Sequence, residues 1–264
     1  MEQLSAYIIT LNEEMRLEAA LQQIAKVADE IVVVDCGSQD KTEQIAHKYG
    51  AKFIFNAWKS FGHQVMVAEN HCSNNFVLRL DADEVLTDEL VEEIQKIKEN
   101  PTADGYKIPI YSVFPGMKKV NRWAAHMDRV SLYHRDKMSM LGHGDHDAVD
   151  FLVATPKIAT TKNYIKHYSY ISIHQAIEKR NRDTNTQVSV VVENGKHYSP
   201  WRMVGIMFLE FFRTYVLKRH FLYGWWGYIY SINYAYSRFT KFSKFYEYEQ
   251  KKKFGWIDME QGEN

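Results

Sequence analysis

The feature that most constrains the fold of this chain is an alternation, in the first hundred residues, of short apolar runs with amphipathic segments. Four runs are short, apolar and typical of buried strands, at 6–10, 31–34, 51–55 and 76–80. Helical patterns follow them, at 17–27, 41–49, 62–72 and 87–98. Strands and helices that alternate at such short spacing build a parallel sheet with right-handed crossovers. We therefore expect a doubly wound, mainly parallel α/β fold.

The pattern changes after Pro101. Residues 106–111 and 129–134 alternate like half-buried strands, and 141–150 is rich in Gly, His and Asp, as loops are. From about residue 173 the chain reads as helical to its end, with a break near 195–200. We expect a ligand-binding and catalytic domain over 1–172 and a helical C-terminal region over 173–264.

The charge distribution separates the same two parts. The net charge is zero, yet residues 1–100 carry 9 Lys and Arg against 18 Asp and Glu, and the remainder carries 24 against 15. Within the basic part, residues 198–248 interleave aromatic with basic side chains, which suits a membrane interface. Packing on the catalytic domain or on a second subunit is the alternative, so a homo-oligomer stays open. The neutral balance and the lack of a recognition motif argue against nucleic acid.

Several features indicate the compartment. The N-terminus has no basic segment before an apolar core, as a signal peptide would, and no stretch of about 18 uninterrupted apolar residues occurs. The chain has only two cysteines, Cys36 and Cys72, which suits a reducing environment. We expect a cytoplasmic protein, peripheral on the inner face of the cytoplasmic membrane if the aromatic region binds lipid.

Polar residues follow three of the predicted strands. Asn12, Asp35 and Asp83 each come just after one, and the carboxyl ends of parallel strands share the edge where ligands bind. The motif Asp81-Ala82-Asp83 supplies the hard oxygen ligands that Mg²⁺ or Mn²⁺ takes beside a diphosphate. Such a motif also occurs as a plain strand-to-helix turn, but its position favours the metal. Asp35 is expected to accept hydrogen bonds from a nucleotide, and Asp40 to be structural.

His146-Asp147 lies in the polar loop. Either side chain could act as a general base, and the concentration of His and Asp around them also suits a metal. A solvated loop without a chemical role is equally compatible with the pattern.

Three segments stand out together, and they are Thr-Leu-Asn-Glu-Glu at 10–14, Ile-Val-Val-Val-Asp-Cys-Gly-Ser-Gln-Asp-Lys-Thr at 31–42 and Leu-Asp-Ala-Asp-Glu at 80–84. They resemble the family 2 glycosyltransferases of the GT-A fold, and within them the lipopolysaccharide-core and lipooligosaccharide β-glucosyltransferase group. The likeness covers about the first 95 residues, and shorter similarities follow at 105–106, 129–133 and 146–149. It implies an inverting, metal-dependent transfer of a sugar, glucose or another hexose, from a UDP-sugar to a cell-envelope saccharide.

The resemblance also implies roles for single residues. Asp147, beside His146, would be the catalytic base, in a position where the group has Glu, and Asp83 would bind Mg²⁺ or Mn²⁺. Asn12, Glu13 and Asp35 would contact the nucleotide. We also expect Thr10, Gln64 and Asp81 to contact the nucleotide-sugar, and Arg135 to contact its diphosphate or the acceptor. Gln64 follows His63 where the group has a more basic pair, and Asp81 would bond the ribose and the sugar.

Three other functions remain as alternatives. A protein side chain could replace the saccharide as acceptor. A nucleotidyltransferase would have a Gly-rich, basic loop after the first strand, whereas residues 11–14 are acidic and lack glycine. A non-catalytic membrane scaffold would not require Asp35, Asp83 and Asp147 together.

Overall fold

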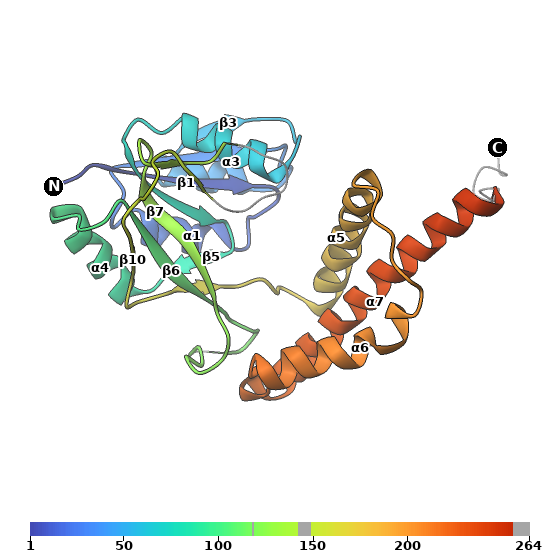
Figure 1. Cartoon of the computed structure of the whole chain (residues 1–264). Helices are drawn as coiled ribbons and strands as arrows, with labels where there is room; N and C mark the ends of the chain where they lie inside the picture. The colour runs from blue at the N-terminus through green and yellow to red at the C-terminus, as the bar shows by residue number, and fades with distance from the viewer. Residues whose placement is uncertain (118, 142–148, 256–264) are drawn as a thin grey trace. The chain divides into compact units, whose positions relative to one another are not determined.

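The computed structural model describes residues 1–117, 119–141 and 149–255, which form two compact units (Figure 1). The first unit comprises Met1–Val113 and His126–Ser169, and the second comprises Phe114–Ala125 and the chain from Tyr170 onward. The first unit holds the sheet, and the second is helical.

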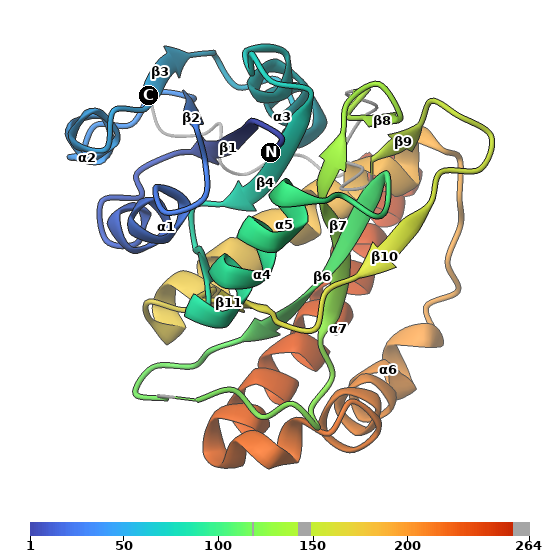
Figure 2. The same cartoon turned by 90° about the vertical axis from the view of Figure 1, so that its left-hand side faces the viewer.

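One mixed sheet runs through the first unit, with strand order β3-β2-β1-β4-β7-β6-β11-β5 and β10 paired to β6 (Figure 2). Its strands are β1 Leu4–Thr10, β2 Glu30–Asp35, β3 Lys52–Phe55, β4 Phe76–Asp81, β5 Glu84–Leu86, β6 Gly105–Ser112, β7 Met127–His134, β10 Ile158–Thr160 and β11 Ile165–His167. Two short strands, β8 Met138–Ser139 and β9 Asp150–Phe151, pair with each other outside this sheet.

The parallel half of the sheet aligns three strand ends. β1 pairs in parallel with both β2 and β4, with Thr10 opposite Asp35 and Ile9 opposite Asp81. The carboxyl ends of β1, β2 and β4 therefore finish at one edge, where crossover loops leave room for a ligand.

Helices cover both faces of this parallel half, as a doubly wound fold requires. They are α1 Leu17–Ile24, α2 Thr42–Lys48, α3 Phe61–Asn70 and α4 Asp88–Glu99. Alternate residues of each strand enter opposite cores: Ile8 lies in the core that contains Leu21 and Ile94, and Tyr7 lies in the core that contains Val65. The expected GT-A-type doubly wound fold is confirmed.

The other half of the sheet is more antiparallel than the alternation predicts. β7 pairs antiparallel with β4 and β6, and β11 pairs antiparallel with β5 and parallel with β6. The sequence patterns predicted β6 and β7 but none of β5, β8, β9, β10 and β11. Strands of two or three residues are too short to show a period of two, so only their partners define them.

The second unit is helical from Ile173, as expected, and has a second interruption, at η1 and η2, that the sequence patterns did not predict. Its helices are α5 Ile173–Glu193, α6 Arg202–Phe212, the π-helix η1 Arg213–Leu217, the 3₁₀ helix η2 His220–Tyr223 and α7 Gly224–Phe254. The break near 195–200 and the aromatic-rich C-terminal helix are confirmed. Phe114 packs among Tyr170, Tyr223, Trp226 and Tyr230 in a small aromatic core. Across the described residues, none of the helices is long and apolar enough to span a bilayer.

Candidate active site

Asp35 ends β2 and organises the turn that follows it. Its buried carboxylate accepts hydrogen bonds from the Gly37 and Ser38 amides, at 2.8 and 2.7 Å, and from the hydroxyl of Thr10 at 2.7 Å. Gly37 has φ +116°, a conformation that other residues rarely adopt. Thr10 and Asp35, both expected to contact the nucleotide, therefore lie together, and their bonds fix the loop backbone at the sheet edge.

Asn12 and Glu13 connect the loop after β1 to this turn. Asn12 has φ 54°. Its backbone amide donates to Ser38 Oγ at 2.7 Å, and its Oδ1 accepts from the backbone amide of Gln39 at 2.9 Å. The Glu13 amide donates to Thr42 Oγ1 at 2.8 Å. The two loops are thus cross-linked into one platform beyond the ends of β1 and β2.

Asp40 completes the platform in the structural role expected of it. Its carboxylate accepts hydrogen bonds from the Thr42 amide at 2.9 Å and from the Glu14 amide at 3.0 Å. These bonds hold the start of α2 against the loop after β1.

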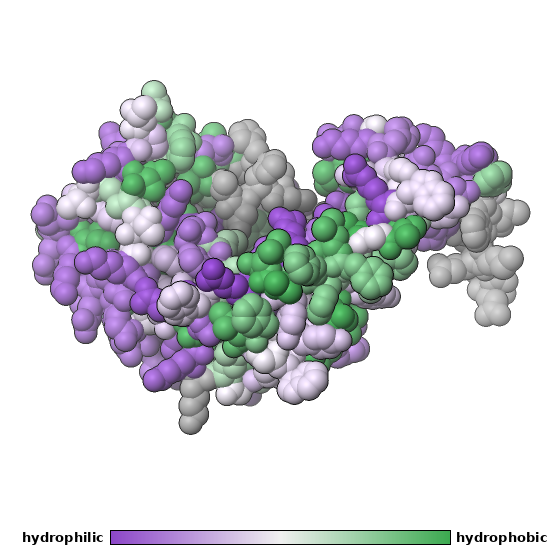
Figure 3. Space-filling view, turned by 60° about the horizontal axis from the view of Figure 1, so that its bottom comes forward, coloured by the Kyte–Doolittle hydropathy of each residue, from purple (hydrophilic) through white to green (hydrophobic). Residues whose placement is uncertain are grey.

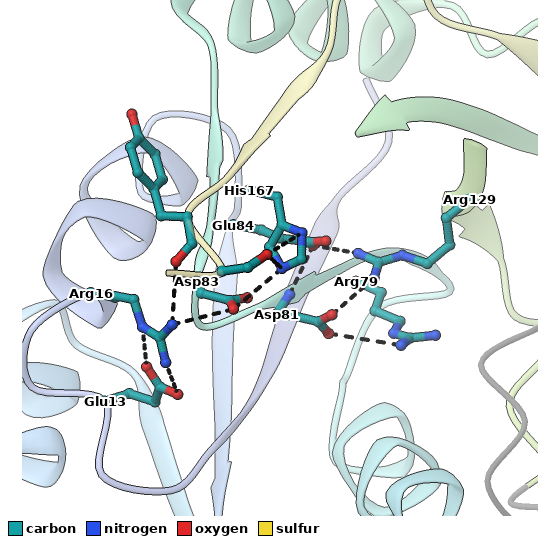
Figure 4. Close-up of polar contacts among 10 residues, drawn as sticks. Glu13, Arg16, Arg79, Asp81, Asp83, Glu84, Arg129 and His167 are labelled. Atoms are coloured by element: carbon teal, nitrogen blue, oxygen red, sulfur yellow. Dashed lines mark hydrogen bonds and ion pairs between the residues drawn. The ribbon is translucent and has the colours of Figure 1, made fainter. Parts of the chain in front are cut away.

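Asp83 lies at the centre of the edge, just beyond β4 (Figure 4). Its Oδ2 is 3.2 Å from His167 Nε2 and 3.4 Å from Arg16 Nη1. Arg16 also makes a bidentate contact with Glu13, at 2.8 and 2.7 Å. The Tyr168 amide donates to the Asp83 carbonyl at 2.8 Å, so β11 and the loop after β1 both meet at this aspartate.

Asp81 and Glu84 lie beside Asp83 and share a guanidinium group. Arg129 Nη1 is 3.0 Å from Asp81 Oδ2, and Arg129 Nη2 donates to Glu84. Burial opposes ionisation of Asp81, but Arg129 and Arg79 outweigh it and hold the pKa of Asp81 below its usual value. Burial dominates at Glu84 and raises its pKa despite Arg129.

His167 places an ionisable imidazole beside the Asp83 carboxylate. Burial alone would lower the pKa of His167, but the hydrogen bond to Asp83 and the neighbouring carboxylates raise it. A carboxylate and an imidazole at this separation suit one Mn²⁺ or Mg²⁺ ion, with diphosphate oxygens and water completing its coordination. Among the described residues no group of three or more His, Cys, Asp or Glu is arranged for a metal.

Two other predicted residues have different surroundings. Gln64 is buried in α3, where its amide exchanges two 2.8 Å hydrogen bonds with Asn56. The Asn56 amide donates to the Asp35 carbonyl at 2.8 Å, so Gln64 supports the loop after β3, which borders the platform. Arg135 is not brought to this edge: it follows His134, which pairs with Phe76 at the start of β4. Because β7 runs antiparallel to β4, Arg135 lies at the opposite end of β4 from Asp83, where it donates to the Glu69 carbonyl at 2.9 Å.

His146 and Asp147 lie outside the described residues, so their predicted roles remain predictions. The flanking strands β8 and β9 pair with each other through Met138–Phe151 and Ser139–Asp150.

Sequence reasoning missed Arg16, Arg129 and His167. Arg129 reaches the edge because β7 is antiparallel, which places the start of that strand beside the end of β4. His167 arrives because β11 pairs with β5 and sets His167 opposite Glu84. Only Arg16 had a usable signal, since it lies three residues after Glu13 in the loop that follows the first strand.

The platform, the acidic edge and the doubly wound sheet together form a candidate ligand site beyond the carboxyl ends of the strands. Residues 5–161 match the family model described as glycosyl transferase family 2. The chain belongs to this family.

Its relatives include a glycosyltransferase of Rickettsia typhi, 33% identical over 94% of this chain and 88% of the relative. The lipopolysaccharide core biosynthesis glycosyltransferase LpsC of Rhizobium meliloti is 24% identical over 92% of each chain. Among solved structures, S. aureus TarS residues 1–349 align over 97% of this chain and 93% of theirs, with 15% identity and a TM-score of 0.47.

Proposed function

We propose that this family 2 glycosyltransferase moves a hexose, with glucose as the first candidate, from a UDP-sugar to a cell-envelope saccharide, and that the anomeric configuration inverts. The proposal rests on one observation. Asp83, His167 and the platform around Asp35 lie at the same edge of the sheet, where its parallel strands end. The relative LpsC supports lipopolysaccharide core, or another lipid-linked glycan, as the acceptor class.

The donor would lie across the platform. Thr10, Asn12, Glu13 and Asp35 border the position that we assign to the nucleoside, and to Asp81 we assign hydrogen bonds from ribose or sugar hydroxyls. Asp83 and His167 would hold Mg²⁺ or Mn²⁺. That ion would neutralise the charge that develops on the diphosphate as it leaves.

The transfer step needs one base. We assign it to Asp147, on the resemblance given above, with His146 beside it. The carboxylate takes the proton of an acceptor hydroxyl while that oxygen bonds to the anomeric carbon, on the face opposite the diphosphate. The bond between the anomeric carbon and the diphosphate oxygen breaks with its electron pair, so the products are UDP and an inverted glycoside.

The decisive experiment measures release of nucleoside diphosphate from UDP-, GDP- and ADP-sugars, with and without Mn²⁺. We expect metal-dependent release from a UDP-sugar, and NMR of a transferred product should show the inverted configuration. Asp83→Asn should reduce turnover at least ~100-fold, because it removes charge stabilisation at the leaving group. Asp88→Asn is the matched control, since Asp88 is an exposed acid only five positions away; near-normal activity in Asp83→Asn would contradict the metal site.

The proposed base has its own test. Asp147→Asn should retain donor binding, measured by calorimetry with the UDP-sugar, and lose transfer. Loss of donor affinity with transfer intact would contradict the assignment.

A separate experiment distinguishes a saccharide acceptor, which we propose, from a protein side chain. Transfer to purified lipopolysaccharide core but not to protein extracts would support the saccharide. Donor binding without turnover on either acceptor would favour the non-catalytic scaffold.

A further inference from the structure

Helix α6 turns an apolar stripe away from the rest of its unit. Four exposed apolar residues recur every three or four positions and so share one face, namely Trp201, just before the helix, then Val204, Phe208 and Phe212. Leu209, next to Phe208, is exposed as well. Trp201 and Phe208 are 82% and 80% exposed. An amphipathic helix of a globular unit normally buries this stripe, so its exposure here needs an explanation.

The opposite side of α6 already has a partner. Glu210 is buried, the ring of Phe211 meets Tyr228 of α7 edge-on, and Met203 contacts Ser243 of α7. Packing of α6 on α7 therefore uses a different face, and the exposed stripe is not part of the core of its unit.

The apolar surface extends beyond α6. Leu217 of η1 and Phe221 of η2 are exposed, and so is Trp225 at the start of α7. The ring of Trp225 contacts Tyr228, the α7 residue that Phe211 meets on the packed side of α6. Figure 3 turns the bottom of Figure 1 forward, and hydrophobic residues gather on the helical unit in this view with hydrophilic ones at their border. A group of this size on a soluble protein marks an interaction site.

The charge of this segment is strongly one-sided. Between residues 201 and 246 the only acid is Glu210, which is buried beside Arg213. The same stretch has seven Lys and Arg residues, namely Arg202, Arg213, Lys218, Arg219, Arg238, Lys241 and Lys244. Arg202 and Arg213 are exposed and eleven positions apart, about three helical turns, so both flank the same side of the stripe.

We propose that the exposed face of α6, continued by Leu217, Phe221 and Trp225, docks in the interface of an anionic bilayer, with Arg202, Arg213, Lys218 and Arg219 on the lipid headgroups. Aromatic and aliphatic side chains enter the acyl boundary while long basic side chains reach the phosphates. Each basic residue adds attraction to an anionic leaflet.

A second copy of the chain is a poorer occupant for this face. A two-fold pair places the same patch against itself, so Arg202 and Arg213 would meet like charges across the contact. The bilayer instead offers negative charge around an apolar layer, which matches both features. The inference rests on α6 and the segment that follows it to Trp225, and it does not depend on the proposed transfer reaction.

The test is flotation of the full-length protein with vesicles of phosphatidylcholine, alone or mixed with phosphatidylglycerol. We expect binding to the mixed vesicles, weakened by salt. Phe208→Ser with Leu209→Ser should reduce binding at least ~tenfold, because two large apolar side chains no longer enter the bilayer. Arg213→Gln with Lys218→Gln should weaken binding to the mixed vesicles about tenfold or more and leave the weaker binding to phosphatidylcholine unchanged.

The chain offers a matched control. Phe151 and Leu152 are also consecutive and exposed, at 55% and 48% against 80% and 61% for Phe208 and Leu209, and they lie in the other unit. Phe151→Ser with Leu152→Ser should bind like the unchanged protein, and circular dichroism should show equal folding of both variants. Equal losses in the two variants would overturn the proposal, as would absence of binding to any vesicle. Dissociation of a dimer by the Phe208 variant, with vesicle binding unchanged, would assign the face to a second copy instead.

Discussion

At the scale of single residues, buried charge at the site is balanced by a few guanidinium groups. Arg129 serves both Asp81 and Glu84, and Arg16 connects Glu13 with Asp83. Removing one partner of a buried pair leaves the other uncompensated, which costs much more than the pair contributes when intact. The arginines that pair with these acids are therefore as important for the site as the acids of the Asp81-Ala82-Asp83 motif.

We expect Arg129→Met to lower the free energy of unfolding by about 3 kcal/mol, since the buried carboxylate of Glu84 and the partly buried one of Asp81 lose their counter-charge. Urea denaturation measures this loss. Lys26→Met removes an exposed ion pair with Asp88 and should cost less than about 1 kcal/mol. Similar costs for the two variants would show that Arg129 is not the balancing group.

A second residue-scale prediction concerns pH. His220 is buried, with Nδ1 at 3.0 Å from the Thr214 carbonyl, and burial is the main cause that lowers its pKa. The unfolded chain then binds the proton more readily, so this contribution to stability is lost as pH falls through the unfolded value of about 6.5. Urea denaturation at about pH 7 and about pH 5.5 should show a larger loss for the unchanged protein than for His220→Asn. Equal losses would mean that His220 does not titrate in this range.

At the scale of elements, strand direction decides which side chains reach the site. Parallel strands β1, β2 and β4 bring Thr10, Asp35 and Asp81 together, as the alternating pattern predicts. Antiparallel β7 adds Arg129 to the same edge and carries Arg135 to the other end of β4. Hydrophobic patterning marks a strand but not its direction. The sequence therefore could not show which of Arg129 and Arg135 lies at the site.

Two helical glycines allow an element-scale prediction. A Cβ at Gly227 would lie 1.7 Å from the His220 carbonyl oxygen, which belongs to the backbone and has little room to move. We expect Gly227→Ala to destabilise the helical unit by at least about 2 kcal/mol, as overpacking does. Gly205 in α6 has nothing within 4 Å of the same position, so Gly205→Ala should stabilise by about 0.5–1 kcal/mol. Thermal unfolding followed by circular dichroism compares them, and a stable Gly227→Ala protein would contradict the close approach.

At the scale of the whole molecule, the donor platform and the aromatic helices belong to different compact units. The described candidate residues lie in the first unit, whereas α5, α6 and α7 form the second. A ligand that binds one folded unit stabilises that unit in proportion to its affinity and concentration.

When UDP and Mn²⁺ are added, amide hydrogen exchange should therefore slow in the first unit and not in the second. We expect protection in the segments 10–14 and 35–42, which form the platform, and in 81–84, which form the acidic edge, with little change in 202–230. Mass spectrometry of peptides from the full-length protein measures both regions at once. Equal protection of the two regions would contradict a donor site confined to the first unit.

The sequence by itself determined the doubly wound class, the parallel core and the positions of Asp35, Asp81 and Asp83 at strand ends. These follow from local patterns, because apolar periodicity and turn chemistry are set by neighbouring residues. It also located the aromatic, basic helices, although not which face of α6 stays exposed.

Only the tertiary structure decided that Arg16, Arg129 and His167 join the acidic edge and that Arg135 does not. The placements of Arg129, Arg135 and His167 depend on pairing between β7 and β4 and between β11 and β5, whose paired residues are 54 or more positions apart in the chain. Register and direction arise from contacts across such distances, and no local pattern encodes them.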